Sequence, residues 1–144
     1  KMKLDALRKK ETIEPDKSKP FSHLVTGIVL RPFSLMDAYK EKVYDAGMLL
    51  ADRVFTRDKY PDRQGAEYWT KFTYPYHWTD ILSTLDTVKQ LGIKDHPKIN
   101  EIHEWFDGQK QIDGTYDVYV MAGAKYKDVK YWITLQYLSI LENA

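Results

Sequence analysis

The sequence predicts an all-α fold of about five helices, arranged as stacked helical hairpins. Apolar residues recur at intervals of three and four along most of the chain, which is the period of a helix with one buried face. Proline, glycine and capping residues divide these stretches into lengths typical of helices. The three most apolar segments begin near residues 22–24, 78 and 129–132, so apolar and amphipathic helices alternate at a spacing of roughly fifty residues.

The first two expected helices span residues 22–31 and 34–54. The run 22–31 is almost uniformly apolar and ends at Pro32; taken alone, it fits either a strand or a buried helix. Ser34 offers an N-cap for the second helix, with Asp37 as a weaker capping-box partner. That helix carries apolar side chains at helical spacing and charged side chains on its other side, so we expect it to be amphipathic.

An aromatic segment follows a polar loop at residues 56–65. Six of the eleven residues from 68 to 78 are aromatic, and Pro75 excludes a regular helix there. Such a cluster either fills a core between helices or lines a cavity. The candidate ligand-binding residues in this segment are Trp69, Tyr74, Tyr76, His77 and Trp78.

His77 and Asp80 are the candidate catalytic residues. They lie three positions apart at the start of an expected helix, which can place an imidazole and a carboxylate on one side of its first turn. A pair of this kind beside an aromatic cavity can act as a general acid or base. In the alternative interpretation, His77 hydrogen-bonds a neighbouring loop and Asp80 only favours the helix N-terminus.

Two further helices are expected after the aromatic segment. Thr79 can cap the first of them, and Gly92 suits the position just after its end. Pro97 is expected at the first position of the next helix, 97–110, with His96 as its cap.

The C-terminal part contains a turn, an irregular stretch and a last helix. Residues 111–116 predict a turn in which Gly114 adopts a positive φ and Asp113 accepts hydrogen bonds from nearby backbone N–H groups. Residues 117–127 alternate weakly, so we expect an extended or irregular stretch with room for a short strand. The last helix, 129–141, is apolar almost all round, which predicts burial on most of its sides.

Composition excludes several classes of protein. The chain has 144 residues and no cysteine, which excludes disulfides, a cysteine nucleophile and a thiolate metal site. The four histidines are scattered without metal-ligand spacing, and no phosphate-binding glycine motif is present. We therefore expect no metal and no cofactor. The chain also lacks an apolar run of about eighteen residues, so we expect no membrane span.

Charge divides the chain into two parts. Residues 1–20 hold seven basic and four acidic side chains and carry +3, whereas the remainder holds fifteen basic and seventeen acidic side chains and carries −2. The basic excess therefore lies in a polar lead-in, which we expect to be solvated or poorly ordered, and not on the helical-hairpin domain of residues 21–144. This distribution does not favour nucleic acid as a partner. No signal-peptide pattern is visible, so we expect a cytoplasmic protein.

Three blocks of sequence, residues 68–82, 91–116 and 131–135, carry a resemblance to a known family. In order and spacing they resemble bacterial and archaeal relatives of the terpenoid cyclase and protein prenyltransferase superfamily, over about residues 22–142. The turn 111–116 is similar to the QW repeat of that superfamily, with Tyr116 where tryptophan is usual. We expect the Tyr116 ring to lie on the end of the preceding helix.

The resemblance implies a fold and a function. Its members are α/α toroids, in which an inner and an outer ring of helices enclose a central cavity. It implies that this chain contributes an aromatic-lined cavity for a hydrophobic or cyclic ligand. The chain lacks the DxDD acid of the cyclases and, without cysteine, cannot build the zinc site of the prenyltransferases. This absence favours the alternative, a non-catalytic helical scaffold for protein–protein interaction.

The chain supplies too few helices for a closed ring, which needs roughly twice as many. The match is to the C-terminal part of such proteins, and an arc of five helices leaves apolar surface uncovered. The chain is a piece of a longer protein, it oligomerises, or it is a reduced relative; its start at Lys1-Met2 favours the first. The expected partner is therefore the remainder of the toroid or a second protomer, with a hydrophobic small molecule as the candidate ligand.

Overall fold

The structure, a computed structural model, describes residues 22–58, 65–73, 78–121 and 128–142. Within these ranges it holds five α-helices, one short 3-10 helix and no strand, which confirms the all-α prediction. The lead-in of residues 1–20 lies outside the described ranges.

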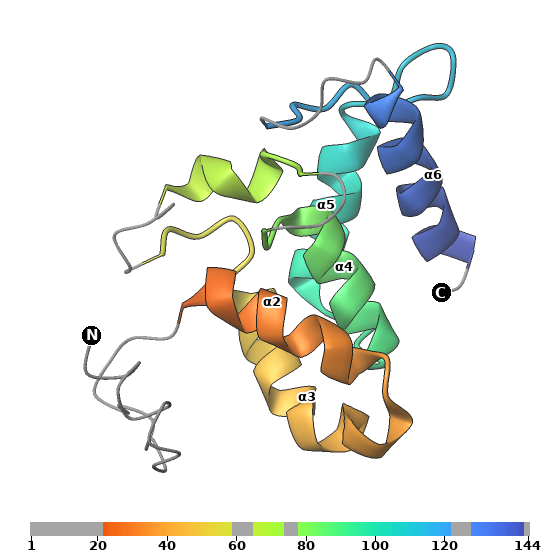
Figure 1. The fold of residues 1–144 in the computed structure, drawn as a ribbon. Helices are drawn as coiled ribbons and strands as arrows, with labels where there is room; N and C mark the ends of the chain where they lie inside the picture. The colour runs from red at the N-terminus through yellow and green to blue at the C-terminus, as the bar shows by residue number, and fades with distance from the viewer. Residues whose placement is uncertain (1–21, 59–64, 74–77, 122–127, 143–144) are drawn as a thin grey trace, which may run out of the picture.

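The α-helices pack around a central one. In chain order the elements are α2 (His23–Ser34), α3 (Asp37–Asp52), η1 (Ala66–Thr70), α4 (Ile81–Gln90), α5 (Pro97–Asp107) and α6 (Val129–Glu142). Helix α4 contacts all four other α-helices, while α3 contacts both α2 and α5. Figure 1 shows α2 and α3 together as a hairpin, with α6 on the far side of α4.

The junction of α2 and α3 corrects two predictions. Pro32 does not end the first helix: it is exposed in the last turn of α2, where it removes only one hydrogen bond of the helix. Ser34 is not an N-cap: it is the last residue of α2, and its Oγ donates to the Arg31 carbonyl at 2.9 Å. Helix α3 has Met36 at its N-cap with no side-chain cap, and Asp37 in its first turn complements the helix dipole.

The start of α4 corrects a third prediction, because Asp80 and not Thr79 is the N-cap. Asp80 Oδ1 accepts from the Ser83 N–H at 2.8 Å, and Ser83 Oγ accepts from the Asp80 N–H at 3.0 Å, forming a capping box. The Thr79 hydroxyl instead donates to the Leu24 carbonyl in α2 at 2.6 Å. Thr79 therefore makes a contact between helices.

Several local predictions are confirmed. Gly92 follows α4 with a φ of +81°, and Gly114 has a φ of +82°. Pro97 opens α5, and His96 caps it by accepting from the Lys98 N–H at 3.2 Å. The prediction for Asp113 also holds, since its Oδ1 accepts from the backbone N–H of Thr115 at 3.0 Å.

Helix α6 is less covered than its composition predicts. It buries one narrow stripe, which consists of Val129, Ile133, Thr134, Tyr137 and Ile140. Its opposite side is exposed and carries Tyr131, Trp132, Leu135, Leu138 and Leu141. The prediction that α6 is buried on most sides is therefore wrong, because hydrophobicity alone does not show whether a neighbour covers each apolar side.

An aromatic core joins α5 to α6. Phe106 stacks on Tyr137 with ring centroids 4.0 Å apart, and Tyr116 meets both rings edge-on. The Tyr116 ring thus lies on the end of α5, as expected. The stretch after it forms only an isolated parallel bridge between Phe72 and Val120 within the described residues, and residues 122–127 lie outside them.

Candidate functional site

The structure describes two of the five candidate ligand-binding residues. Trp69 is 1% exposed, and its Nε1 donates to the Thr56 carbonyl at 2.9 Å. Trp78 is half-buried, and its carbonyl accepts from the Arg31 guanidinium at 3.2 Å. Tyr74, Tyr76 and His77 lie outside the described residues. Trp69 is thus a core residue. Neither Trp69 nor Trp78 lines any of the hollows described below.

Asp80 has a structural role at the start of α4. Its carboxyl is fully buried, and Oδ2 has no hydrogen-bond partner among the described residues. Burial raises the pKa of Asp80 to about 6; hydrogen bonds with Ser83 and the nearby Arg31 guanidinium oppose that rise. The carboxyl is fully buried in a capping box, so the geometry assigns it to capping.

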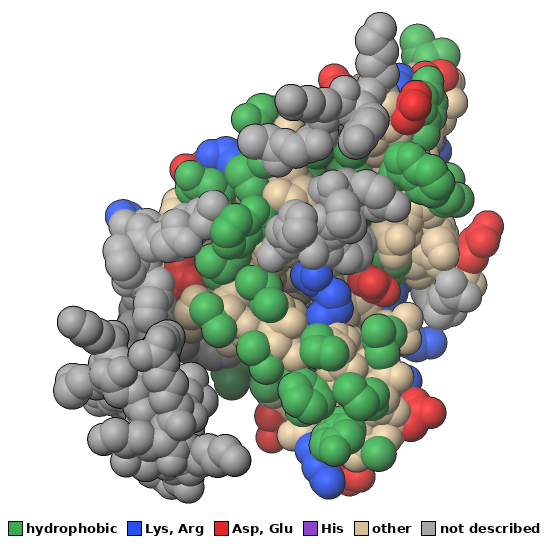
Figure 2. Space-filling model, in the orientation of Figure 1, with side chains coloured by type: hydrophobic (Ala, Val, Ile, Leu, Met, Phe, Trp, Pro, Cys, Tyr) green, Lys and Arg blue, Asp and Glu red, His purple; other side chains and the backbone are tan. Residues whose placement is uncertain are grey.

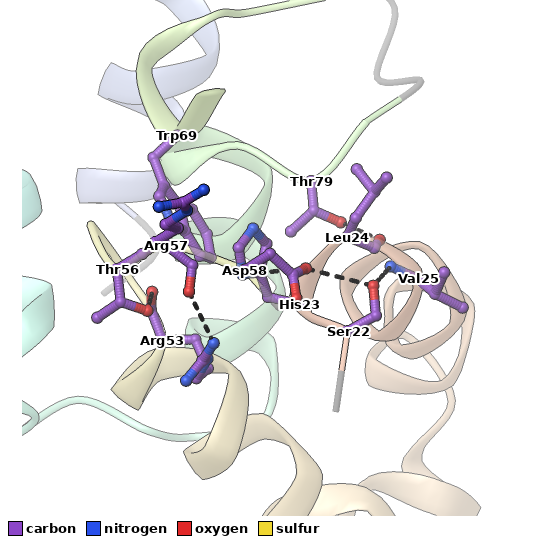
Figure 3. Close-up of polar contacts among 10 residues, drawn as sticks. All are labelled: Ser22, His23, Leu24, Val25, Arg53, Thr56, Arg57, Asp58, Trp69 and Thr79. Atoms are coloured by element: carbon purple, nitrogen blue, oxygen red, sulfur yellow. Dashed lines mark hydrogen bonds and ion pairs between the residues drawn. The ribbon is translucent and has the colours of Figure 1, made fainter. Parts of the chain in front are cut away.

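A buried polar cluster that the sequence did not reveal lies at the start of α2 (Figure 3). The His23 ring lies against the Trp69 ring at a tilt of 34°, with ring centroids 4.4 Å apart, and its Nδ1 lies 3.4 Å from Asp58 Oδ2. The Ser22 hydroxyl donates to the same carboxylate oxygen at 3.4 Å. Burial lowers the pKa of His23, and the nearby Arg53 lowers it further, against the opposing effect of Asp58.

These residue types resemble a nucleophile–base–acid set, but their arrangement differs. In a catalytic triad the serine hydroxyl bonds the histidine, which takes its proton. Here the Ser22 hydroxyl bonds Asp58, and it also accepts from the Val25 N–H as the N-cap of α2. His23 is buried against the Trp69 ring. The cluster therefore anchors α2 to the segment after α3, and no sequence spacing signals a pair 35 positions apart.

A hollow of about 530 Å³ lies between α4 and α6. It is lined by Leu35, Asp86, Lys89, Gln90, Gln136, Ser139 and Ile140. In α4, only Asp86, Lys89 and Gln90 are not buried, so the solvent-facing strip of the central helix lies in this hollow. The sequence did not single out those three residues, because it did not reveal that α6 lies opposite them.

Partial burial shifts the pKa of both charged side chains in this hollow. Burial raises the pKa of Asp86, while a hydrogen bond from Gln90 and the charge of Arg31 act in the opposite direction. Burial also lowers the pKa of Lys89, and the like charge of Lys94 adds to that effect. The lining thus combines one acid, one base, two side-chain amides and a hydroxyl with the apolar side chains of Leu35 and Ile140.

Two shallower hollows lie elsewhere. One of about 430 Å³ surrounds the 111–116 turn, where Lys130 and Asp113 form an ion pair of 3.7 Å. The other, of about 230 Å³, lies between α3 and the segment before α5. In the described ranges no three His, Asp or Glu side chains are grouped to hold a metal ion, and no helix there is both long and apolar enough to span a membrane.

Exposed apolar side chains gather on α2 and α6, as Figure 2 shows for one face of the molecule. On α2 and its C-terminal end they are Val25, Ile28, Val29, Leu35 and Met36. The segment 22–31 was expected to be a strand or a buried helix; it is a helix, and one side of α2 is open. Both helices thus carry apolar surface that nothing in the described part of the chain covers.

Comparison with family models, with curated proteins and with solved structures found no match to this chain. The resemblance to the terpenoid cyclase and prenyltransferase superfamily therefore stays a prediction.

Proposed function

We propose that this chain is a non-catalytic helical scaffold that assembles with another helical unit through the outer face of α6. The observation that carries the proposal is that α6 has two apolar faces. One face packs on α4 and α5, and the other is exposed, with Leu135 57% accessible near its middle. The only charged residues of α6 are Lys130 and Glu142, near its two ends. A helix with this pattern is suited to lie between two neighbours.

The contacts between helices support a scaffold of stacked hairpins. Helix α4 contacts α2 on one side and α6 on the other, while α3 contacts α5. We infer that α2, α4 and α6 lie in one layer, with α3, which also contacts α4, and α5 in a second. An array of this kind needs polar outer faces where it ends, and α6 instead presents apolar side chains. The occupant that fits is a further helical hairpin, as in the remainder of an α/α toroid or in a second protomer.

The roles of the described candidate residues also support a non-catalytic function. Asp80 caps a helix, Trp69 packs in the core, and the His23–Asp58 pair is buried. A hydrophobic ligand site would rest on the half-buried Trp78 and on Tyr74, Tyr76 and His77, which lie outside the described residues. We therefore prefer the scaffold to the ligand-binding alternative.

The test is the association of the purified chain. The purified chain has only a second copy of itself as a partner. We therefore expect its apparent mass, measured by size exclusion with light scattering, to rise with protein concentration. Leu135→Glu places a charge in the centre of the outer α6 face and should shift the chain to monomer. Leu49→Glu is the matched control, because Leu49 is similarly exposed on α3, at 54%, away from that face. A chain that is monomeric up to about 1 mM, or that dissociates equally in both variants, contradicts the proposal.

A further inference from the structure

We propose that the outer face of α6 binds the same face of a second copy of this chain, with the two helices antiparallel around a two-fold axis. This inference rests on the proposed scaffold function and names the helical unit that covers α6. Figure 1 shows α6 at the edge of the molecule, and the five large apolar side chains of its outer face are between 38% and 57% exposed.

The centre of this face is a line of four exposed side chains, which we call the α6 seam. It consists of Tyr131, Leu135, Leu138 and Glu142. Successive residues of an α-helix are turned by about 100°, so these four lie in one line, opposite the stripe that α6 buries. Their intervals of four, three and four residues are those of side chains that interlock between two packed helices.

The spacing of the seam is the same when it is read from either end. Its midpoint lies between Leu135 and Leu138. When two such helices lie antiparallel, Leu135 therefore faces the partner's Leu138, and Tyr131 faces the partner's Glu142. Contacts that repeat in this reciprocal way are what a two-fold interface between identical copies requires.

Charge at the ends of the seam favours the antiparallel direction. Antiparallel pairing brings the partner's Glu142 to the Tyr131 hydroxyl and to the Lys130 ammonium, which lies 4.9 Å from the centre of the Tyr131 ring. Lys130 also pairs with Asp113 at 3.7 Å, and an ammonium has donors for both carboxylates. Parallel pairing would instead place each charged residue beside its own counterpart. The exposed Asp128 opposes the attraction, so charge sets the direction and adds little to the strength.

The size of the face sets the strength of the pair. Two aromatic and three leucine side chains on each copy are about half exposed, so the pair covers on the order of 800 Å² of apolar surface. Specific interfaces begin near about 1,200 Å² in total, including their polar rims. We therefore expect a weak dimer, with a dissociation constant of about 10–500 μM.

The experiment uses introduced cysteines, because the native chain has none and each cross-link then reports one contact. Tyr131→Cys and Glu142→Cys are oxidised alone and as an equal mixture, at about 0.5 mM chain. In the antiparallel pair each position lies about 17 Å along the axis from its own counterpart, which is too far for a disulfide. We therefore expect at least about tenfold more disulfide dimer in the mixture than in either variant alone.

Further variants distinguish this arrangement from other modes of association. Leu138→Glu should raise the dissociation constant at least about tenfold, as Leu135→Glu should, because both positions lie at the centre of the seam. Val29→Glu, on the exposed side of α2, should leave the dissociation constant unchanged. Loss of association in Val29→Glu, or a mass above that of a dimer, would indicate that α6 binds α2 of the next copy and would overturn the inference.

The cross-linking result also separates this inference from the scaffold proposal. Equal cross-linking of each cysteine variant alone would indicate parallel helices, and the absence of a cross-link in the mixture would exclude the antiparallel pair. Either result overturns the inference, while the scaffold proposal stands as long as Leu135→Glu dissociates the chain. A native chain that stays monomeric up to about 1 mM overturns both.

Discussion

Asp80 is a residue at which two physical requirements conflict. The first turn of α4 needs an acceptor for its free N–H groups, and the Asp80 carboxylate supplies one to Ser83. The same carboxylate is fully buried, and its Oδ2 lacks a hydrogen bond within the described structure. Burial therefore penalises the charged form that caps best.

This conflict predicts a pH-dependent stability. Burial raises the pKa of Asp80 from 3.8 to about 6, so the folded state holds the proton more tightly than the unfolded state. The contribution of Asp80 to the free energy of unfolding is fully present below about pH 4. It is lost as the pH rises to about 6, which lowers the free energy of unfolding by about 3 kcal/mol. Asp80→Asn keeps a good capping residue and removes the titration.

The measurement is urea unfolding of both proteins from pH 4 to pH 7. The difference between the free energies of unfolding of Asp80→Asn and the native chain should increase from pH 4 to pH 7. Taking this difference cancels the contribution of the other titrating groups, which both proteins share. A constant difference would show that the carboxyl is not desolvated in the folded protein.

Single residues also show which features the sequence could reveal. His96, Pro97 and Gly114 were predicted correctly because each residue type suits the local backbone conformation at its own position. Thr79 was misjudged because its hydroxyl bonds Leu24, 55 positions away, and no local pattern shows that contact. The His23–Asp58 pair was missed for the same reason.

At the scale of elements, α2 and the start of α4 meet at a glycine. A Cβ at Gly27 would overlap the Thr79 side chain, which is held in place by its hydrogen bond to Leu24. Gly27 lies in the middle of α2, where alanine is normally favoured by about 1 kcal/mol. The close approach of the two elements therefore decides which residue this position accepts.

Gly27→Ala should destabilise the protein by about 1–3 kcal/mol, because α2 must move away from Thr79. Gly108→Ala is the control: Gly108 has a φ of −66°, and the nearest atom to an added Cβ is 3.4 Å away. It should be neutral or slightly stabilising in thermal unfolding monitored by circular dichroism. Equal melting temperatures for Gly27→Ala and the native chain would rule out the close contact.

Helices α4 and α6 show what hydrophobic periodicity can and cannot predict. Both segments were correctly expected to be helices, because the period of three to four residues is a local property. The sequence did not reveal which side of α6 is covered. The strip of Asp86, Lys89 and Gln90 faces a hollow only because α6 lies opposite, and the outer side of α6 is open only because no described element covers it.

For the whole molecule, Tyr137 is the residue that ties α6 to the rest. Its ring stacks on Phe106 at 4.0 Å and meets Tyr116 edge-on, and its hydroxyl lies 2.9 Å from His103 Nδ1. Burial raises the pKa of the Tyr137 hydroxyl well above its usual range, and burial lowers the pKa of His103. Both side chains are therefore uncharged at pH 7, and the hydrogen bond between them joins α5 and α6.

We expect Tyr137→Ala to cost about 3–5 kcal/mol, a large part of the ~5–15 kcal/mol that stabilises a typical domain. If the five α-helices form one cooperative unit, far-ultraviolet circular dichroism and tryptophan fluorescence should report the same urea transition, moved to lower urea. Tyr131→Ala is the matched control, since Tyr131 is 52% exposed on the outer side of α6 and should change stability by less than about 0.5 kcal/mol. Two separate transitions in Tyr137→Ala would mean that α6 unfolds on its own, and an equal loss in both variants would mean that the aromatic core does not hold α6 in place.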